Sequence, residues 1–453
     1  MKRNKKPVQW FKKILTLFVV VILAESLSAC DSFQTPDSIL GLPLQQNEEL
    51  TTPTPELEIE EVIPVDEVAA VDEETTGPIG DEISELILWV PPFMDPDSGT
   101  AAGKLLGDRL ESFTNSYDGL SIDVRVKAEE GPADLMASLT STSAAAPLAM
   151  PSLIMLSRSD LELAAKKGLI LPVGDYTTVI NDLDWFQYAR LMAIIGDSAY
   201  GLPFAGDALV TLSSKDDLPT TWSEFFTTRQ KVAFEAGDPM AHLILAYYLS
   251  LGGALNVEGE GLILESDILT EVLTVFQEGN EAEVFSSDLI SVDDAGLIEQ
   301  FQTETTDTII TWSTNYLSGN LENAEIHPVI PLTGYNYTIA DGWILALADP
   351  LPERRDLAVK LAEFLVDKEF MAEWSNKAGY LPMRSSSLAL WPEGESIDTL
   401  SLISHSAHIY PDQETMSVIA PILAQSLAEV LEQGIDPTTA AQNAVMALEG
   451  IEE

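Results

Sequence analysis

Short apolar runs alternate with amphipathic segments along most of the chain, and this alternation limits the fold more than any other feature. Residues 86–90 form an apolar run that ends at two prolines, and residues 104–114 then repeat apolar side chains at helical spacing. The same order continues through residues 122–168. Alternating strands and helices predict βαβ units around a largely parallel sheet. We therefore expect an α/β fold, with C-terminal helices over residues 415–448 that are interrupted near Gly434. Further strands are predicted for residues 232–234, 308–311 and 341–348. Further helices are predicted for residues 241–251, 268–277 and 353–367, and another helix is expected to start at residues 221–224.

The first thirty residues have the composition of an export signal. Lys and Arg residues precede an apolar run at residues 14–24, which is too short to span a bilayer comfortably. Leu27, Ser28, Ala29 and Cys30 follow, and this motif resembles the bacterial lipobox, whose cysteine accepts a lipid. Cys30 is the only cysteine in the sequence, so an internal disulfide is excluded. We expect residues 1–30 to be a lipoprotein signal peptide, with an uncleaved anchor helix as the alternative. In both cases the rest of the chain faces the extracytoplasmic side of the cell membrane.

Residues 31–82 are strongly acidic. No Lys or Arg occurs from Asp31 to Gly103, and Thr-Pro repeats separate the clustered acids. A segment of this kind buries too little apolar surface to fold, and its charges repel one another. We predict a disordered tether that, as a random coil, spans about 40 Å.

The whole chain carries a formal charge of -50 over 453 residues. This balance argues against nucleic acid as a partner and against electrostatic attachment to anionic lipid. Dispersed surface acids mostly serve solubility. Residues 83–453 are long enough for two lobes.

The order of short motifs after the tether resembles the family of extracellular solute-binding proteins that includes maltose-binding protein. Each motif alone is weak, but the motifs are collinear and follow a lipobox. They are LILWV at 86–90, PSLIML at 151–156, AAKKGLILP at 164–172, YGLPF at 200–204, LPTTWSEF at 218–225, LGGAL at 251–255, DGWILAL at 341–347 and GYLPMR at 379–384.

The resemblance implies a two-lobed, periplasmic-binding-protein-like α/β fold with a hinged cleft. The first lobe would span about 83–205 and 333–380, and the second about 206–332 and 381–453. Such a protein, expected to be a monomer, would bind a small polar solute, a mono- or oligosaccharide. It would then deliver this solute to the permease subunits of an ABC importer.

Sugar recognition needs flat apolar faces together with planar hydrogen-bonding side chains. Trp343, which follows Asp341 and Gly342 at a predicted strand start, suits stacking on a sugar ring, with core packing as the alternative. A second aromatic and polar cluster contains Trp312, Asn315 and Tyr316. Further candidates are Asp95 and Asp97 in the loop after the first strand, Ser157 and Arg158 after the third, Asp207 in the first crossover, and Arg384.

Catalysis finds little support in the sequence. The four histidines are scattered, and neither a Gly-x-Ser-x-Gly elbow nor a phosphate loop occurs. We therefore expect no enzyme activity, metal or cofactor. Alternative functions are a surface carbohydrate-active enzyme, a sensor or adhesion lipoprotein, and a binding protein for another solute such as a polyamine. A carboxylate-rich cleft would suit a polyamine.

Overall fold

The computed structural model describes residues 85–215, 217–257, 261–319, 321, 323–394 and 396–452. The predicted signal peptide, Cys30 and the acidic tether lie outside the described residues.

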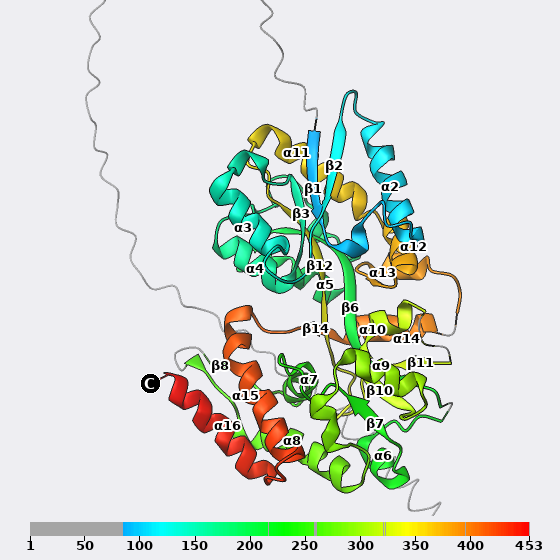
Figure 1. The fold of residues 1–453 in the computed structure, drawn as a ribbon, viewed down its shortest axis with the longest axis vertical. Helices are drawn as coiled ribbons and strands as arrows, with labels where there is room; N and C mark the ends of the chain where they lie inside the picture. The colour runs from blue at the N-terminus through cyan, green and yellow to red at the C-terminus, as the bar shows by residue number, and fades with distance from the viewer. Residues whose placement is uncertain are drawn as a thin grey trace, which may run out of the picture. The chain divides into compact units, whose positions relative to one another are not determined.

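The first lobe is built on three parallel strands. β1 (Glu85–Val90) lies between β2 (Ser121–Val126) and β3 (Leu153–Ser157). Every residue of β1 after Glu85 is buried, as its uninterrupted apolar run predicts. The predicted helix at 104–114 is confirmed as α2 (Ala101–Thr114), whose first turn is capped by the Thr100 hydroxyl. Figure 1 shows α2, α3 (Leu135–Ala145), α4 (Arg158–Lys166) and α11 (Pro352–Leu365) around these strands.

The second lobe has β10 (Thr308–Trp312) at the centre of its sheet. β10 pairs in parallel with β7 (Val232–Phe234) and antiparallel with the crossover strand β6 (Gly201–Ser213), which also pairs with β11 (Glu325–His327). The predicted C-terminal helices are confirmed as α15 (Gln413–Leu431) and α16 (Pro437–Glu452), which pack against α8 (Ser266–Glu281). The break between them contains Gly434, whose positive φ of 63° favours glycine.

Two long strands connect the lobes (Figure 1). The first part of β6 pairs antiparallel with β12 (Thr338–Leu347), and its last residues pair with β10. β12 also pairs antiparallel with β3, in parallel with β14 (Ala407–Ile409), and β13 (Leu381–Pro382) adds to β6. The prediction of a largely parallel sheet is therefore wrong at the centre of the molecule, because the crossover strands run against their neighbours. The sequence patterns also placed the start of β12 too late, at Asp341.

The crossover strands approach each other closely. A Cβ atom on Gly342 would lie 2.4 Å from the carbonyl oxygen of Ala205 and 2.5 Å from the Met383 methyl group. Such contacts are shorter than real Cβ atoms make, so this position requires glycine. Gly342 thereby allows β12 to pack against both β6 and β13.

The remaining elements complete the two lobes. Among the described residues, α15 alone has the length and composition to cross a bilayer, and more than half of its most apolar window is buried within the fold. The other helices and strands are α5 (Gln187–Met192), α6 (Trp222–Thr228), α7 (His242–Ser250), α9 (Asp294–Gln302), α10 (Ser313–Leu317), α12 (Lys368–Ala378), α13 (Ser385–Ala389), α14 (Ser396–Ser406), β4 (Ile194–Ile195), β5 (Ser198–Ala199), β8 (Asn256–Val257) and β9 (Gly261–Leu262), with short 3-10 turns at Pro92–Met94, Pro147–Ala149, Val179–Asn181 and Ser287–Ser291.

Candidate functional site

A cavity of about 220 Å³ lies where β6, β10 and β12 meet. Glu129, which follows β2 of the first lobe, and Asn315, on α10 after β10 of the second lobe, both line it. The cavity therefore lies beyond the carboxyl ends of strands from both lobes, the usual ligand position in α/β folds. Its lining residues are Glu129, Asp207, Asp294, Trp312, Thr314, Asn315, Asp341, Gly342, Trp343 and Tyr380.

Asp207 is held in place on β6 by neutral donors. Its Oδ1 accepts hydrogen bonds from the Ser313 hydroxyl (2.6 Å) and from the backbone N–H groups of Thr314 (3.0 Å) and Ala208 (2.9 Å). Its Oδ2 accepts from the Thr314 hydroxyl at 2.6 Å. Burial nevertheless raises the pKa of this carboxyl to about 6, despite the hydrogen bonds that favour the ionised form. Asp207 is thus a rigid, weakly acidic group on the cavity wall.

Asp341 lies on β12 and also has neutral partners. Its Oδ1 accepts hydrogen bonds from the Gly342 N–H at 2.7 Å and from the Tyr410 hydroxyl at 3.2 Å. Burial raises the pKa of this carboxyl too, and the field of His242 partly offsets the effect. The two crossover strands therefore bring two carboxyl groups with raised pKa values to one cavity.

Trp343 and Tyr380 form the aromatic wall on the first-lobe side. Both rings are partly exposed, and both pack on Phe93, with ring centroids 5.2 Å apart for Trp343 and 4.7 Å apart for Tyr380. Tyr380 also stacks on Trp374, which is fully buried. The wall is therefore fixed from behind by the core and keeps ring surface available to the cavity.

Trp312 and Asn315 line the cavity on the second-lobe side. The Asn315 amide donates to both carboxylate oxygens of Asp294 at 2.9 Å and to the Thr311 hydroxyl at 2.8 Å. The Trp312 ring packs edge-on against His242 at 5.1 Å, and His242 Nδ1 donates to Asp238 at 2.8 Å. This wall therefore presents an indole ring, a carboxylate and hydroxyl groups in fixed positions.

Comparison with known proteins identifies the family of the chain. A sequence profile described as bacterial extracellular solute-binding protein matches residues 109–398. The chain belongs to this family. A solute-binding protein of this kind acts outside the cytoplasm and is a binding protein, not an enzyme, as the sequence resemblance implied. No curated protein matches the sequence.

Solved structures of similar fold support the two-lobed architecture of this solute-binding protein. Maltose-bound MalE3 of T. maritima shares 15% identity, with a TM-score of 0.63, and the alignment covers 81% of this chain and 99% of that chain. The maltose-binding periplasmic protein MalE from Listeria monocytogenes, in complex with maltose, shares 15% identity, with a TM-score of 0.65 and coverage of 81% and 97%. UgpB from Mycobacterium tuberculosis, in complex with glycerophosphocholine, shares 16% identity, with a TM-score of 0.61 and coverage of 82% and 98%. At this identity the likeness concerns the fold.

The structure places several sequence-predicted residues of this solute-binding protein together and others elsewhere. Trp343, Asp341, Trp312, Asn315 and Asp207 line the cavity. The remaining candidates lie outside its lining. Tyr316 packs against the core, Asp97 is exposed while the Asp95 carboxylate accepts from its backbone N–H at 2.9 Å, and the Ser157 hydroxyl caps α4 by accepting from the Asp160 N–H.

Arg158 has a structural environment. Its guanidinium is buried, donates to the backbone carbonyl groups of Met192 (2.8 Å) and Ile194 (2.6 Å), and forms an ion pair with Glu162 at 2.8 Å. These contacts join α4 to the end of α5 and the following strand.

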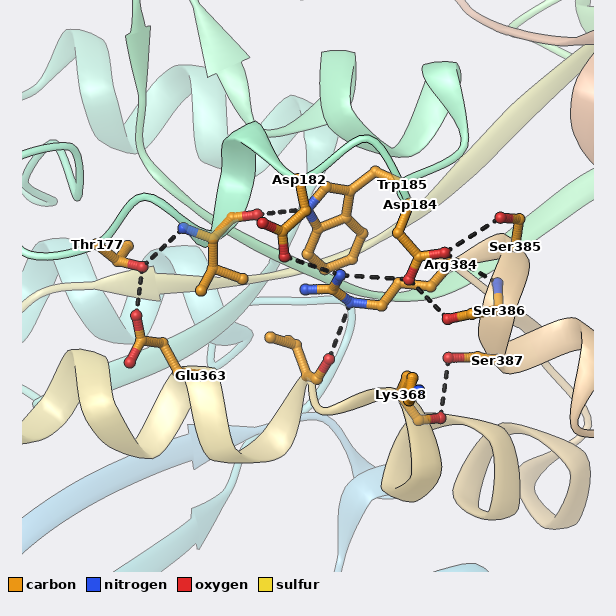
Figure 2. Close-up of polar contacts among 12 residues, drawn as sticks. Thr177, Asp182, Asp184, Trp185, Glu363, Lys368, Arg384, Ser385, Ser386 and Ser387 are labelled. Atoms are coloured by element: carbon orange, nitrogen blue, oxygen red, sulfur yellow. Dashed lines mark hydrogen bonds and ion pairs between the residues drawn. The ribbon is translucent and has the colours of Figure 1, made fainter.

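Arg384 is also buried and belongs to a separate polar network, which Figure 2 shows in close-up. Its guanidinium stacks over the Trp185 ring at 3.8 Å, donates to the Val366 carbonyl oxygen at 3.1 Å, and forms an ion pair with Asp182 at 3.1 Å. Asp184 accepts from the Ser386 N–H at 3.0 Å and so satisfies the start of α13. Arg384 therefore holds three chain segments together.

Glu129, Asp294, Thr314, Gly342 and Tyr380 also line the cavity but were not chosen as site residues from the sequence. Tyr380 belongs to the recognised motif at 379–384, so its position beside a crossover strand was a usable signal. Glu129 and Asp294 are two acids among many, and no local pattern distinguishes them.

Proposed function

We propose that this protein binds a small polar solute, a mono- or oligosaccharide, in the cavity between its lobes and delivers it to the permease subunits of an ABC importer. The observation that carries the proposal is the pair of partly exposed indole rings, Trp312 and Trp343, that line one cavity together with hydroxyl, amide and carboxylate groups. Indole rings suit the apolar face of a sugar, and the polar groups suit its hydroxyls.

Ligands of proteins with the same fold support the sugar class. Solved structures of similar fold contain maltose, maltotetraose and α-D-tagatose. Those ligands belong to those proteins, and the shared fold places a cleft between two lobes in each. A sugar is therefore the first class of solute to test here.

Closure of the lobes around the solute forms part of the proposal. We place the lobe boundaries within or beside β6, β12 and β13, with the first lobe spanning about 83–205 and 333–380 and the second about 206–332 and 381–453. The first boundary lies within β6, the last lies at the start of β13, and the one at 332–333 precedes β12. Hinge motion at a few such positions closes a cleft, buries the ligand and excludes water.

Attachment to the membrane through lipid on Cys30 completes the proposal. An anchored protein keeps its solute close to a permease, and lipoproteins carry enough acyl chains for stable anchoring. Replacing Cys30 with Ser is expected to release the protein from the membrane fraction or to leave it uncleaved. A wild-type protein that carries no lipid in mass spectrometry would contradict the anchor without affecting the solute-binding proposal.

The experiment that tests the proposal is a thermal-shift screen across neutral sugars, amino sugars, amines and amino acids, followed by calorimetric titration of the best ligand. A ligand at one hundred times its Kd adds about 2.7 kcal/mol to the stability of the folded protein, which a melting curve resolves. Loss of uptake of that ligand in cells that lack the protein tests delivery. Binding confined to amino acids would overturn the sugar class, and unchanged uptake would overturn the importer role.

A further inference from the structure

Four of the residues that line the cavity are carboxylates, Glu129, Asp207, Asp294 and Asp341, and the described lining contains neither Lys nor Arg. We infer that the solute bound in this cavity carries a protonated amine. The inference rests on the proposed solute binding and names the charge of the ligand. It depends on a comparison of these carboxylates, three of them partly buried and Glu129 exposed, with the fully buried acids of the protein.

The two fully buried acids among the described residues, Asp349 and Glu162, have cationic partners. Asp349, fully buried, pairs with Arg354 at 3.0 Å, and Glu162 pairs with Arg158 at 2.8 Å. Pairing of this kind is the general rule, because an unpaired buried charge is costly. In both cases an arginine balances an acid that the fold encloses completely.

The acids of the cavity differ from these. Asp207, Asp294 and Asp341 accept hydrogen bonds from hydroxyl, amide and backbone N–H groups, all of them neutral. These bonds orient the carboxylates but leave their charge without a counterion in the described lining. A ligand cation would supply it and form the stronger, charge-assisted hydrogen bonds.

The protonation behaviour of the cavity is consistent with a missing positive charge. Burial raises the pKa of Asp207 and Asp341, and burial together with Glu130 raises the pKa of Glu129. The field of His242 reaches Asp341, but its ring is already hydrogen-bonded to Asp238. A cation that enters the cavity would favour the ionised carboxylates and lower all of these pKa values.

An organic cation fits the cavity better than a metal ion. Within the described residues, no three His, Cys, Asp or Glu side chains converge as metal ligands. The walls instead carry Trp312, Trp343 and Tyr380, and aromatic faces attract ammonium groups as well as the C–H surface of sugars. Carboxylates beside aromatic rings therefore match an amine on an apolar or sugar framework.

Two sources of this chemistry are an amino sugar and a linear polyamine, and a matched series of ligands separates them. Cellobiose, the glucosamine disaccharide with the same β-1,4 linkage, and its N-acetylated form carry a hydroxyl, an ammonium and a neutral amide at the same ring position. Spermidine supplies the amine without a sugar. Each is titrated into the purified protein at pH 7 by calorimetry.

Stronger binding of the glucosamine disaccharide than of both neutral disaccharides, by about tenfold or more, is expected for an amino sugar. Strong binding of spermidine alone also supports the inference but overturns the sugar class of the proposed function. Equal or stronger binding of cellobiose overturns the inference and leaves the proposed function standing. Binding of none of the four ligands counts against both.

The variant Asp341→Asn tests the site itself. The amide keeps the size of the side chain and an acceptor for Gly342 and Tyr410, so the fold is expected to persist. We expect affinity for the bound amine ligand to fall about tenfold or more. The control Asp118→Asn removes the same charge from an exposed turn and is expected to leave affinity within about twofold. Equal losses of affinity in the two variants would show that only the overall negative charge of the protein matters, and this would overturn the inference.

Discussion

Asp207 and Asp341 lie directly opposite each other in the antiparallel pairing of β6 with β12. Like charges at such a position destabilise a sheet, because directly opposite side chains share one face. The pair lies on the two strands that join the lobes, at the wall of the cavity. The pairing of the two crossover strands therefore brings both acids to the place where a ligand would contact both lobes.

We predict that Asp207→Asn stabilises the ligand-free protein at pH 8 by roughly 1–3 kcal/mol, by about half of that at pH 5, and hardly at all below about pH 4. The folded-state pKa of about 6 lies above the ordinary value of 3.8, so the wild-type folded state binds the extra proton. Its stability therefore falls as the pH rises from about 4 to 6, and the cost is complete above pH 6. Melting curves of both proteins across this range measure the difference.

Titration of the other groups near Asp207 does not account for the expected pH dependence. Burial raises the pKa of Tyr188 and of Tyr380, so neither phenol titrates between pH 5 and 8. Burial also raises the pKa of Asp341, but both proteins retain that residue. A stability difference that does not change with pH would contradict the prediction.

We predict that Trp343→Ala weakens ligand binding by roughly 1.5–3 kcal/mol with little change in the ligand-free melting temperature. The ring is partly exposed at the cavity, so its removal takes away ligand contact more than core packing. Calorimetric titration and thermal melting measure the two effects. The matched control Trp374→Ala removes a fully buried ring behind the same wall and is expected to cost about 3–5 kcal/mol of stability. A similar loss of stability in both variants would place Trp343 in the core.

We predict that Arg384→Ala lowers the free energy of unfolding by roughly 1–3 kcal/mol, because it removes the buried stack on Trp185 and the hydrogen bond to Val366, while the partly exposed Asp182 and Asp184 remain solvated. Ligand affinity of the folded variant is expected to stay the same, since Arg384 does not line the cavity. Chemical denaturation and titration measure these quantities. Arg125→Ala breaks an exposed pair with Asp123 and is expected to cost less than about 1 kcal/mol. Weaker ligand binding at unchanged stability would instead favour the ligand-binding role that the sequence suggested for Arg384.

We predict that Gly342→Ala destabilises the protein by roughly 1–3 kcal/mol, because the new methyl group would meet the Ala205 carbonyl oxygen and the Met383 side chain. Gly107→Ala is the control. That position lies inside α2 and has only an ordinary 3.6 Å contact to Pro96, so alanine is expected to stabilise it by about 0.4–1 kcal/mol. Thermal melting of both variants measures the two effects. If alanine at position 342 stabilises the protein as much as alanine at position 107, the close approach of the crossover strands at Gly342 is contradicted.

The local elements of this protein follow from short-range features of the sequence. The apolar run at 86–90 predicted β1, and Thr221 followed by Glu224 predicted the start of α6, where the Thr221 hydroxyl does accept the Glu224 N–H. These features depend on neighbours within a few residues. The recognised motifs added the two-lobed fold and the position of Trp343.

Which acids and aromatic residues meet depends on the long-range packing of the fold. Asp207 and Asp341 come together through the long-range pairing of β6 with β12, and Asp294 reaches the same cavity from α9. In a chain with 73 acidic residues, local sequence does not separate these from the solvated majority. Arg158 and Arg384 also looked like surface or ligand-binding cations until the fold surrounded them with carbonyl oxygens and carboxylates. Burial and counterion pairing depend on distant segments, and these two properties distinguish structural charges from those left for a ligand.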